Sequence, residues 1–194
     1  GMSRVHGTLG KFGGLARAAG MAAVAGGAAI AGGFVAAIKA AANFEQQLNT
    51  FQAVSHATGK EMAKVSKLAK KMGADLSLPG TSAKDAAEAL TELAKGGLSV
   101  NKAMGALKAT LQLSAAAQIE NARAAQIVSD ALNGFGLKAK EATRVVDLLA
   151  NAANATSGDI EQFADALQMS AAVAHQLGVP IEDLITMLGE MANA

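Results

Sequence analysis

Apolar residues recur at helical spacing in seven successive segments of this chain. In each segment they follow an i, i+3, i+4, i+7 pattern, as Ala142, Val145, Val146 and Leu149 do. This spacing places them on one face of an α-helix. Alanine supplies 47 of the 194 residues, whereas Val, Ile and Thr together supply 27, so local propensity also favours helix over strand. The pattern predicts an all-α chain and excludes a β-sandwich or barrel.

The breaks between the segments are typical of short helices. Pro79-Gly80 interrupts the chain, and Thr81 or Ser82 can cap the helix that follows it; Ser99 can cap another. We therefore predict a multi-helix bundle of short amphipathic helices and helical hairpins, preceded by a Gly/Ala-rich hydrophobic helix. Its seven apolar stripes occupy residues 62–72, 83–94, 100–111, 124–135, 142–153, 160–174 and 181–191.

Three helix ends share one sequence device. Gly97-Leu98, Gly136-Leu137 and Gly178-Val179 each place glycine before an apolar residue. This order predicts a left-handed C-terminal cap with a hydrophobic contact. The three glycines lie 39 and 42 residues apart, about the length of one helical hairpin. The spacing indicates stacked helical pairs, although three weak copies do not by themselves define a solenoid.

The N-terminal region contains 21 consecutive uncharged residues, from Ala18 to Ile38. Their number suits a bilayer span, and a signal peptide is a second interpretation. A third is close self-association, because small residues recur every four positions. We predict a membrane or self-association segment marked by Ala19, Ala23, Gly27, Ala31, Gly33 and Phe34.

Charge divides the chain unevenly. Residues 1–74 carry nine Lys or Arg and two Asp or Glu, a net +7, whereas residues 75–194 carry eight and fourteen, a net −6. The basic half can face an acidic partner, a lipid headgroup layer or nucleic acid, or can simply be a solvated surface. We predict two parts: residues 1–59, a Gly/Ala-rich apolar segment with a lead-in helix, and residues 60–194, the helical body.

Side chains that carry out chemistry are scarce. The chain has no cysteine, and its three histidines are far apart in sequence, without metal-ligand spacing. Carboxylate pairs such as Glu88 with Glu92, or Glu182 with Asp183, flank apolar stripes, where solvated helix faces are expected. We therefore predict no enzyme activity, no cofactor and no metal site.

One helix face concentrates positive charge. Lys60, Lys64, Lys67 and Lys71 share a face by their spacing of three to four residues. The sequence places no aromatic platform for stacking bases beside them. A solvated face and a phosphate or lipid contact both remain open, and contact with DNA is undecided.

Several ordered segments together resemble the core region of phage tail tape measure proteins. They include residues 42–45, 54–59, 81–99, 131–137, 146–154 and 178–184, so the resemblance covers about residues 18–194. The strongest piece reads TSAKDAAEALTELAKGGLS, at residues 81–99. The residues that carry the family-like motif are Ala86, Ala87, Leu90, Leu93, Ala94, Gly97, Leu98, Ser99, Phe135 and Gly136.

The resemblance implies a structural virion protein. Tape measure proteins act in tail assembly and length determination, and they take part in genome delivery through the host envelope. Implied partners are further copies of the chain in the tail lumen, the tail tube protein, tail-assembly chaperones, tail-tip proteins and the host membrane during ejection. The implied location is the tube lumen of the virion tail, with the host cytoplasm as the site of assembly.

Two further expectations follow from the resemblance. Family members continue past a segment like residues 187–194 into another Gly-rich stretch, so we expect this chain to be a fragment of a longer protein. The alternative function is a membrane-active or pore-forming helical protein without a ruler role.

Overall fold

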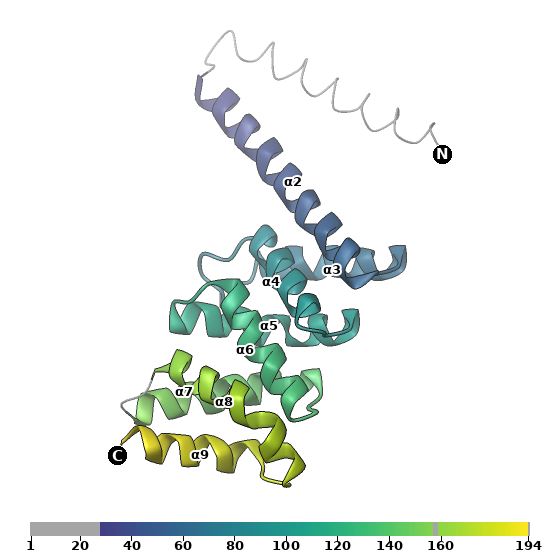
Figure 1. The fold of residues 1–194 in the computed structure, drawn as a ribbon. Coiled ribbons are helices and arrows are strands. Elements are labelled where there is room, and N and C mark those ends of the chain that lie inside the picture. Colours follow the sequence, from purple (N-terminus) through teal and green to yellow (C-terminus); the bar gives the residue numbers. More distant parts are fainter. Residues whose placement is uncertain (1–27, 157–158, 194) are drawn as a thin grey trace. The chain divides into compact units, whose positions relative to one another are not determined.

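The computed structural model describes residues 28–156 and 159–193, with side chains from residue 35 onward. Within these ranges the chain forms helices and no strand, so the predicted all-α fold is confirmed (Figure 1). The α-helices are α2 (Ala28–Ser55), α3 (Gly59–Met72), α4 (Ala83–Lys95), α5 (Val100–Ala117), α6 (Asn121–Gly134), α7 (Ala142–Ala155), α8 (Ile160–Gln176) and α9 (Ile181–Ala192), with a 3₁₀ turn, η1 (Ala139–Glu141), before α7.

The chain divides into two compact units, Gly1–Asn43 and Phe44–Ala194. The described part of the first unit is the N-terminal portion of α2, in which Val35 and Ile38 are exposed. No helix among the described residues is both long and apolar enough to cross a membrane. The predicted division after residue 59 stays a prediction.

The small-residue segment predicted near the N-terminus lies largely outside the described residues. This is the case for Ala19, Ala23 and Gly27. The backbone of Ala31, Gly33 and Phe34 belongs to α2. The role of this segment in membrane binding or self-association therefore stays a prediction.

The second unit contains two rows of helices. The odd row is α3, α5, α7 and α9, and the even row is α4, α6 and α8. Each helix packs on the next member of its row. Contacts also join α4 to α5, α6 to α7 and α8 to α9 across the rows. Three helical hairpins follow one another in this way, α4–α5, α6–α7 and α8–α9, here called the first, second and third hairpins (Figure 1).

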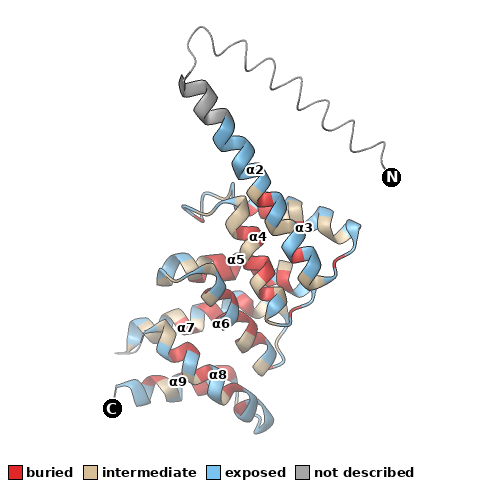
Figure 2. Ribbon diagram, turned by 45° about the horizontal axis from the view of Figure 1, so that its top comes forward, coloured by how far each residue is buried: buried red, intermediate tan, exposed pale blue. Residues whose placement is uncertain are grey.

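The core of the second unit lies between the two rows and is rich in alanine and leucine. Buried residues line the inner helix faces (Figure 2). Leu90, Leu107, Leu132 and Leu149 are essentially inaccessible to solvent. Burial of one such side chain contributes about 1.5–3 kcal/mol. The many buried alanines add little area each, but they allow neighbouring helices to approach closely.

Polar residues and a proline precede the first turn of several helices, in the N-cap position. Ser82 caps α4 in a reciprocal pair with Asp85, and Asp159 caps α8 by accepting a hydrogen bond from the Gln162 backbone N–H. Ser99 occupies the predicted N-cap position of α5, but its side chain makes no capping hydrogen bond. Pro180 is the N-cap residue of α9, one position before the first helical turn.

Candidate functional site: the interfaces between hairpins

The turn inside each hairpin is built by the same backbone geometry. Gly97, Gly136 and Gly178 adopt φ values of 86°, 62° and 75°, which side chains rarely tolerate. The next residue then donates its backbone N–H to a carbonyl five residues earlier, at 3.1, 2.7 and 2.9 Å in turn. These are complete Schellman caps, and the predicted left-handed ends are confirmed at all three turns.

The residues of the family-like motif lie in and around these turns. In α4, Ala86, Ala87, Leu90 and Leu93 are buried, whereas Ala94 is partly buried. Leu98 is also buried, directly after the cap glycine. The motif therefore combines the buried face of α4 with the turn that folds α5 back beside it. A functional role for these residues beyond this packing stays a prediction.

Helices of successive hairpins approach closely where small residues meet. A methyl group on Gly134 of α6 would lie 2.7 Å from Cβ of Ala171 in α8. A methyl group on Gly96, at the end of α4, would lie 2.6 Å from Cβ of Ser129 in α6. The Asn133 side-chain amide also donates to the Gly96 carbonyl at 2.7 Å. The interface therefore requires glycine at both crossings.

Arginine bridges the even row. The Arg123 guanidinium of α6 donates from Nε to Glu161 at 2.6 Å and from Nη2 to Asp165, both in α8. These hydrogen bonds, that to Asp165 first, raise the pKa of Arg123 above its ordinary value. In the same interface, Gln168 donates to Asp130 at 3.1 Å. Burial raises the pKa of the Asp130 carboxyl.

A second arginine bridges the odd row. Arg144 of α7 contacts Glu182 of α9 and donates to Glu141 at 3.0 Å. A hydrogen bond from the Lys138 backbone N–H and the Arg144 charge keep the pKa of Glu141 below its ordinary value. The pairs Arg123–Glu161 and Arg144–Glu182 each join residues 38 positions apart. Sequence reasoning missed them, although opposite charges one repeat apart were a usable signal.

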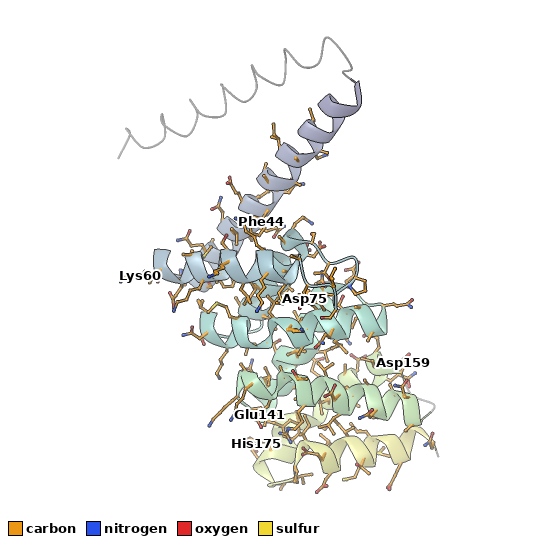
Figure 3. All side chains as sticks on the ribbon, turned by 180° about the vertical axis from the view of Figure 1, so that it is seen from behind. Phe44, Lys60, Asp75, Glu141, Asp159 and His175 are labelled. Carbon is orange, nitrogen blue, oxygen red and sulfur yellow. The ribbon has the colours of Figure 1, made fainter. Side chains whose placement is uncertain are left out.

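An aromatic contact closes the second turn against the third hairpin. The Phe135 and His175 rings meet edge to face, with centroids 6.2 Å apart. Figure 3 labels His175 and Glu141 on this part of the stack. His175 is exposed, and its ring contact was not predicted. Phe135, the C-cap residue of α6, is itself buried.

The basic face of α3 is exposed to solvent. This holds for all five lysines of the helix, Lys60, Lys64, Lys67, Lys70 and Lys71. Lys70 places its ammonium group 5.6 Å from the centre of the Phe44 ring, a cation–π contact that was not predicted. No base-stacking platform results, because Phe44 itself is only 9% exposed.

Of the carboxylates considered for catalysis, Glu88, Glu92 and Glu182 are engaged in ion pairs. Glu88 pairs with Lys84 at 3.3 Å and Glu92 with Lys95 at 2.8 Å. Across the described residues, no group of three or more His, Cys, Asp or Glu side chains could hold a metal ion. What the structure does assemble is a set of helix–helix interfaces.

Comparison with known proteins shows which proteins this chain resembles. A sequence profile described as "phage-related minor tail protein" matches residues 66–194. The tape measure protein of Pneumococcus phage Dp-1 is 34% identical over 159 residues, which are 82% of this chain and 14% of that protein. The probable tape measure protein of Escherichia phage P2 is 30% identical over 153 residues, 78% of this chain and 18% of that protein.

The chain thus spans less than a fifth of the length of either relative. No solved structure matches it. The match covers all three hairpins, including the turns, the glycine crossings and both arginine bridges.

Proposed function

Because this chain belongs to the phage-related minor tail protein family and forms a tape measure protein region, we propose that it acts in tail assembly, length determination and genome delivery. Its location is the virion tail, in the lumen of the tube, after assembly in the host cytoplasm. The family match favours this role over a membrane-active protein without a ruler function.

Within that role, the three hairpins act as a fixed module rather than as measured span. A continuous α-helix advances about 1.5 Å per residue, so chain length converts directly into axial length. A hairpin stack advances by only one interaxial distance, about 8–10 Å, for each hairpin. The observation that carries this proposal is the return of the chain at Gly97, Gly136 and Gly178. Length measurement then belongs to uninterrupted helix elsewhere in the tape measure protein.

The surfaces of the chain suggest how it meets its partners. The exposed lysines of α3 offer a basic face to acidic surfaces of the tail tube protein, tail-tip proteins or assembly chaperones. DNA phosphates are a further candidate for this face. Residues 1–43 are assigned to self-association and to the host membrane during ejection, because their small residues favour close helix contact.

Duplication of one structural unit in the phage gene tests the fixed-module proposal. A second copy of residues 98–136, inserted after Gly136, adds 39 residues that run from one cap glycine to the next. Repeat stacks tolerate such insertions because each unit contacts only its neighbours. We expect tails whose length changes by about 10 Å or less. Tails longer by about 60 Å, the span of 39 residues in one helix, would overturn the proposal.

Two controls make the electron microscopy decisive. Duplication of 39 residues of uninterrupted helix elsewhere in the full-length protein should lengthen the tail by about 60 Å. Deletion of residues 98–136 should abolish assembly or DNA delivery rather than shorten the tail in proportion. Viable particles whose tails shorten by about 1.5 Å per deleted residue would assign these hairpins to the measured span.

A further inference from the structure

The third hairpin carries an uncovered apolar face. In α8, Met169, Val173 and Leu177 are 83%, 59% and 75% exposed, and in α9 Met187 and Met191 are 54% and 74% exposed. We call these five residues the open face. They follow helical spacing on each helix, so they form two continuous stripes rather than scattered side chains. A monomeric protein rarely leaves such a stripe in contact with water.

In the even row, the equivalent residues of the second hairpin are buried. Counted back from the cap glycine, the residues at −9, −5 and −1 are Met169, Val173 and Leu177 in the third hairpin. In the second hairpin these positions hold Ile127, Ala131 and Phe135, all at most 5% exposed. Phe135, the C-cap residue of α6, meets His175 of α8. The third hairpin therefore covers the end of this stripe at Phe135.

The odd row repeats the relation. Counted forward from the cap glycine, positions +9 and +13 hold Met187 and Met191 in α9, and both residues are exposed. In α7 these positions are Val145 and Leu149, and in α5 they are Ala106 and Thr110; all four are fully buried. Two hairpins thus bury these positions, and only the last one leaves them open.

A hollow lies between α8 and α9, and Met191 of the open face lines it. Its volume is about 230 Å³, and its walls include Phe163, Ala166, Leu188 and Met191. No charged side chain lines it. Such a hollow accepts an apolar side chain from a helix laid across it.

We propose that the open face seats one further helical hairpin, built like α8–α9 and supplied by the same polypeptide in the full-length tape measure protein. This inference rests on the proposed function, and it continues an interface that the first, second and third hairpins already form twice. The relatives leave ample length for it, because this chain aligns with only 14% and 18% of them.

Charge argues against a second copy of this face as the occupant. Residues 159–193 carry six Asp or Glu and no Lys or Arg. Arg123 and Arg144 of the second hairpin neutralise three of these carboxylates, so the third hairpin keeps three, Asp159, Asp183 and Glu190. Two such faces placed together would repel each other, and anionic lipid would be repelled in the same way. The seated hairpin should therefore present alanine, leucine or valine to the stripes and a basic side chain at the rim, as Arg123 and Arg144 do within the stack.

Photo-crosslinking in assembled tails tests the occupant directly. A photoreactive amino acid replaces Val173 or Met191 in the full-length protein, and mass spectrometry identifies the linked peptides. We expect a several-fold higher yield than at Leu76, an apolar residue that is 98% exposed outside the open face. The linked peptide should come from a part of the full-length protein outside residues 1–194, and mixed isotope labelling should show that both peptides belong to one copy.

The outcomes separate the two proposals. Links to another copy or to the tube protein, or yields no higher than at Leu76, would overturn the inference while the protein still sits in the tail. Absence of the protein from purified tails would instead overturn the proposed function. As an independent readout, Val173→Asp should lower the Tm of the full-length protein by several degrees and that of the 194-residue chain by less than about one degree. Equal effects on both would also overturn the inference.

Discussion

A single hydrogen atom at Gly134 sets the distance between α6 and α8. Because Cβ of Ala171 would lie 2.7 Å from a new methyl group, Gly134→Ala should force the helices apart. We expect a loss of about 1–3 kcal/mol in the free energy of unfolding, typical of an overpacked site. Helix propensity alone would predict a gain of about 1 kcal/mol. The sign of the change in the free energy of unfolding therefore shows whether overpacking or helix propensity dominates. Urea denaturation measures it.

Two further variants control this result. Ala171→Gly in the Gly134→Ala background removes the opposing methyl group and should recover part of the lost stability. Gly59→Ala should cost little or nothing, because no atom lies within 4 Å of its added methyl group. A Gly134→Ala protein as stable as the original would show that the crossing is looser than the structure has it.

Asp75 ties the loop after α3 to α5 and gives the chain an acid-sensitive contact. Hydrogen bonds from the Ser77 side chain and backbone, and then from Lys108, lower the pKa of Asp75 from 3.8 to about 2. A carboxyl group whose pKa is lowered by folding stabilises the fold at pH values above its unfolded-state pKa. This stabilisation is lost as the pH falls through the folded-state pKa. Asp75→Asn should therefore lower Tm at pH 7, by an amount that shrinks between pH 4 and pH 2.

Thermal melts across this pH range test the contact. The Tm values of the variant and the original chain should approach each other as the pH falls to 2 and converge below it, where Asp75 is protonated in both the folded and the unfolded chain. Glu45→Gln, a carboxylate change elsewhere in the unit, controls for general charge effects. A Tm difference that stays constant from pH 7 to pH 2 would contradict the assigned pKa.

At the scale of helices, one repeat position gives a matched pair of substitutions. Leu149 in α7 and Met191 in α9 both lie thirteen residues after a cap glycine, but the first is fully buried and the second is 74% exposed. Leu149→Asp should cost at least 3 kcal/mol, because it buries an unpaired charge. Met191→Asp should change the stability of the 194-residue chain by less than about 0.5 kcal/mol. Similar losses in both would contradict the burial pattern.

The elements were predictable where the signal is local. Apolar spacing located the helices of the second unit, and a glycine followed by an apolar residue located all three turns. These signals lie within a few residues of one another, so they depend little on tertiary structure. The Arg123 and Arg144 bridges join residues 38 positions apart and were missed, because their partners are chosen by how hairpins stack.

At the scale of the whole chain, the family was predictable and the site was not. The order of short motifs indicated tape measure proteins, and the comparisons confirm this assignment. The stack of hairpins required contacts between helices that no single motif encodes. The open face could be recognised only by comparing the exposure of equivalent positions, such as Val145 and Met187, in successive hairpins.

Removal of residues 1–42 tests the role assigned to the N-terminal segment. The full chain should float with liposomes and form larger particles, because its small-residue rows favour lipid or close helix contact. The shortened chain should do neither and should keep the Tm of the second unit, which begins at Phe44. Flotation and analytical ultracentrifugation measure both properties. Equal lipid binding and equal particle mass would remove the segment from this role.

The Schellman turns have a mechanical consequence. Each hairpin folds back on itself and packs on its neighbouring hairpins. Tension applied to the two ends should therefore unfold one hairpin at a time instead of the whole unit at once. An unfolded repeat of 39 residues extends to about 130 Å. A protein pulled through a narrow tube would then lengthen in steps of similar size, and optical tweezers would record a sawtooth rather than a single rupture.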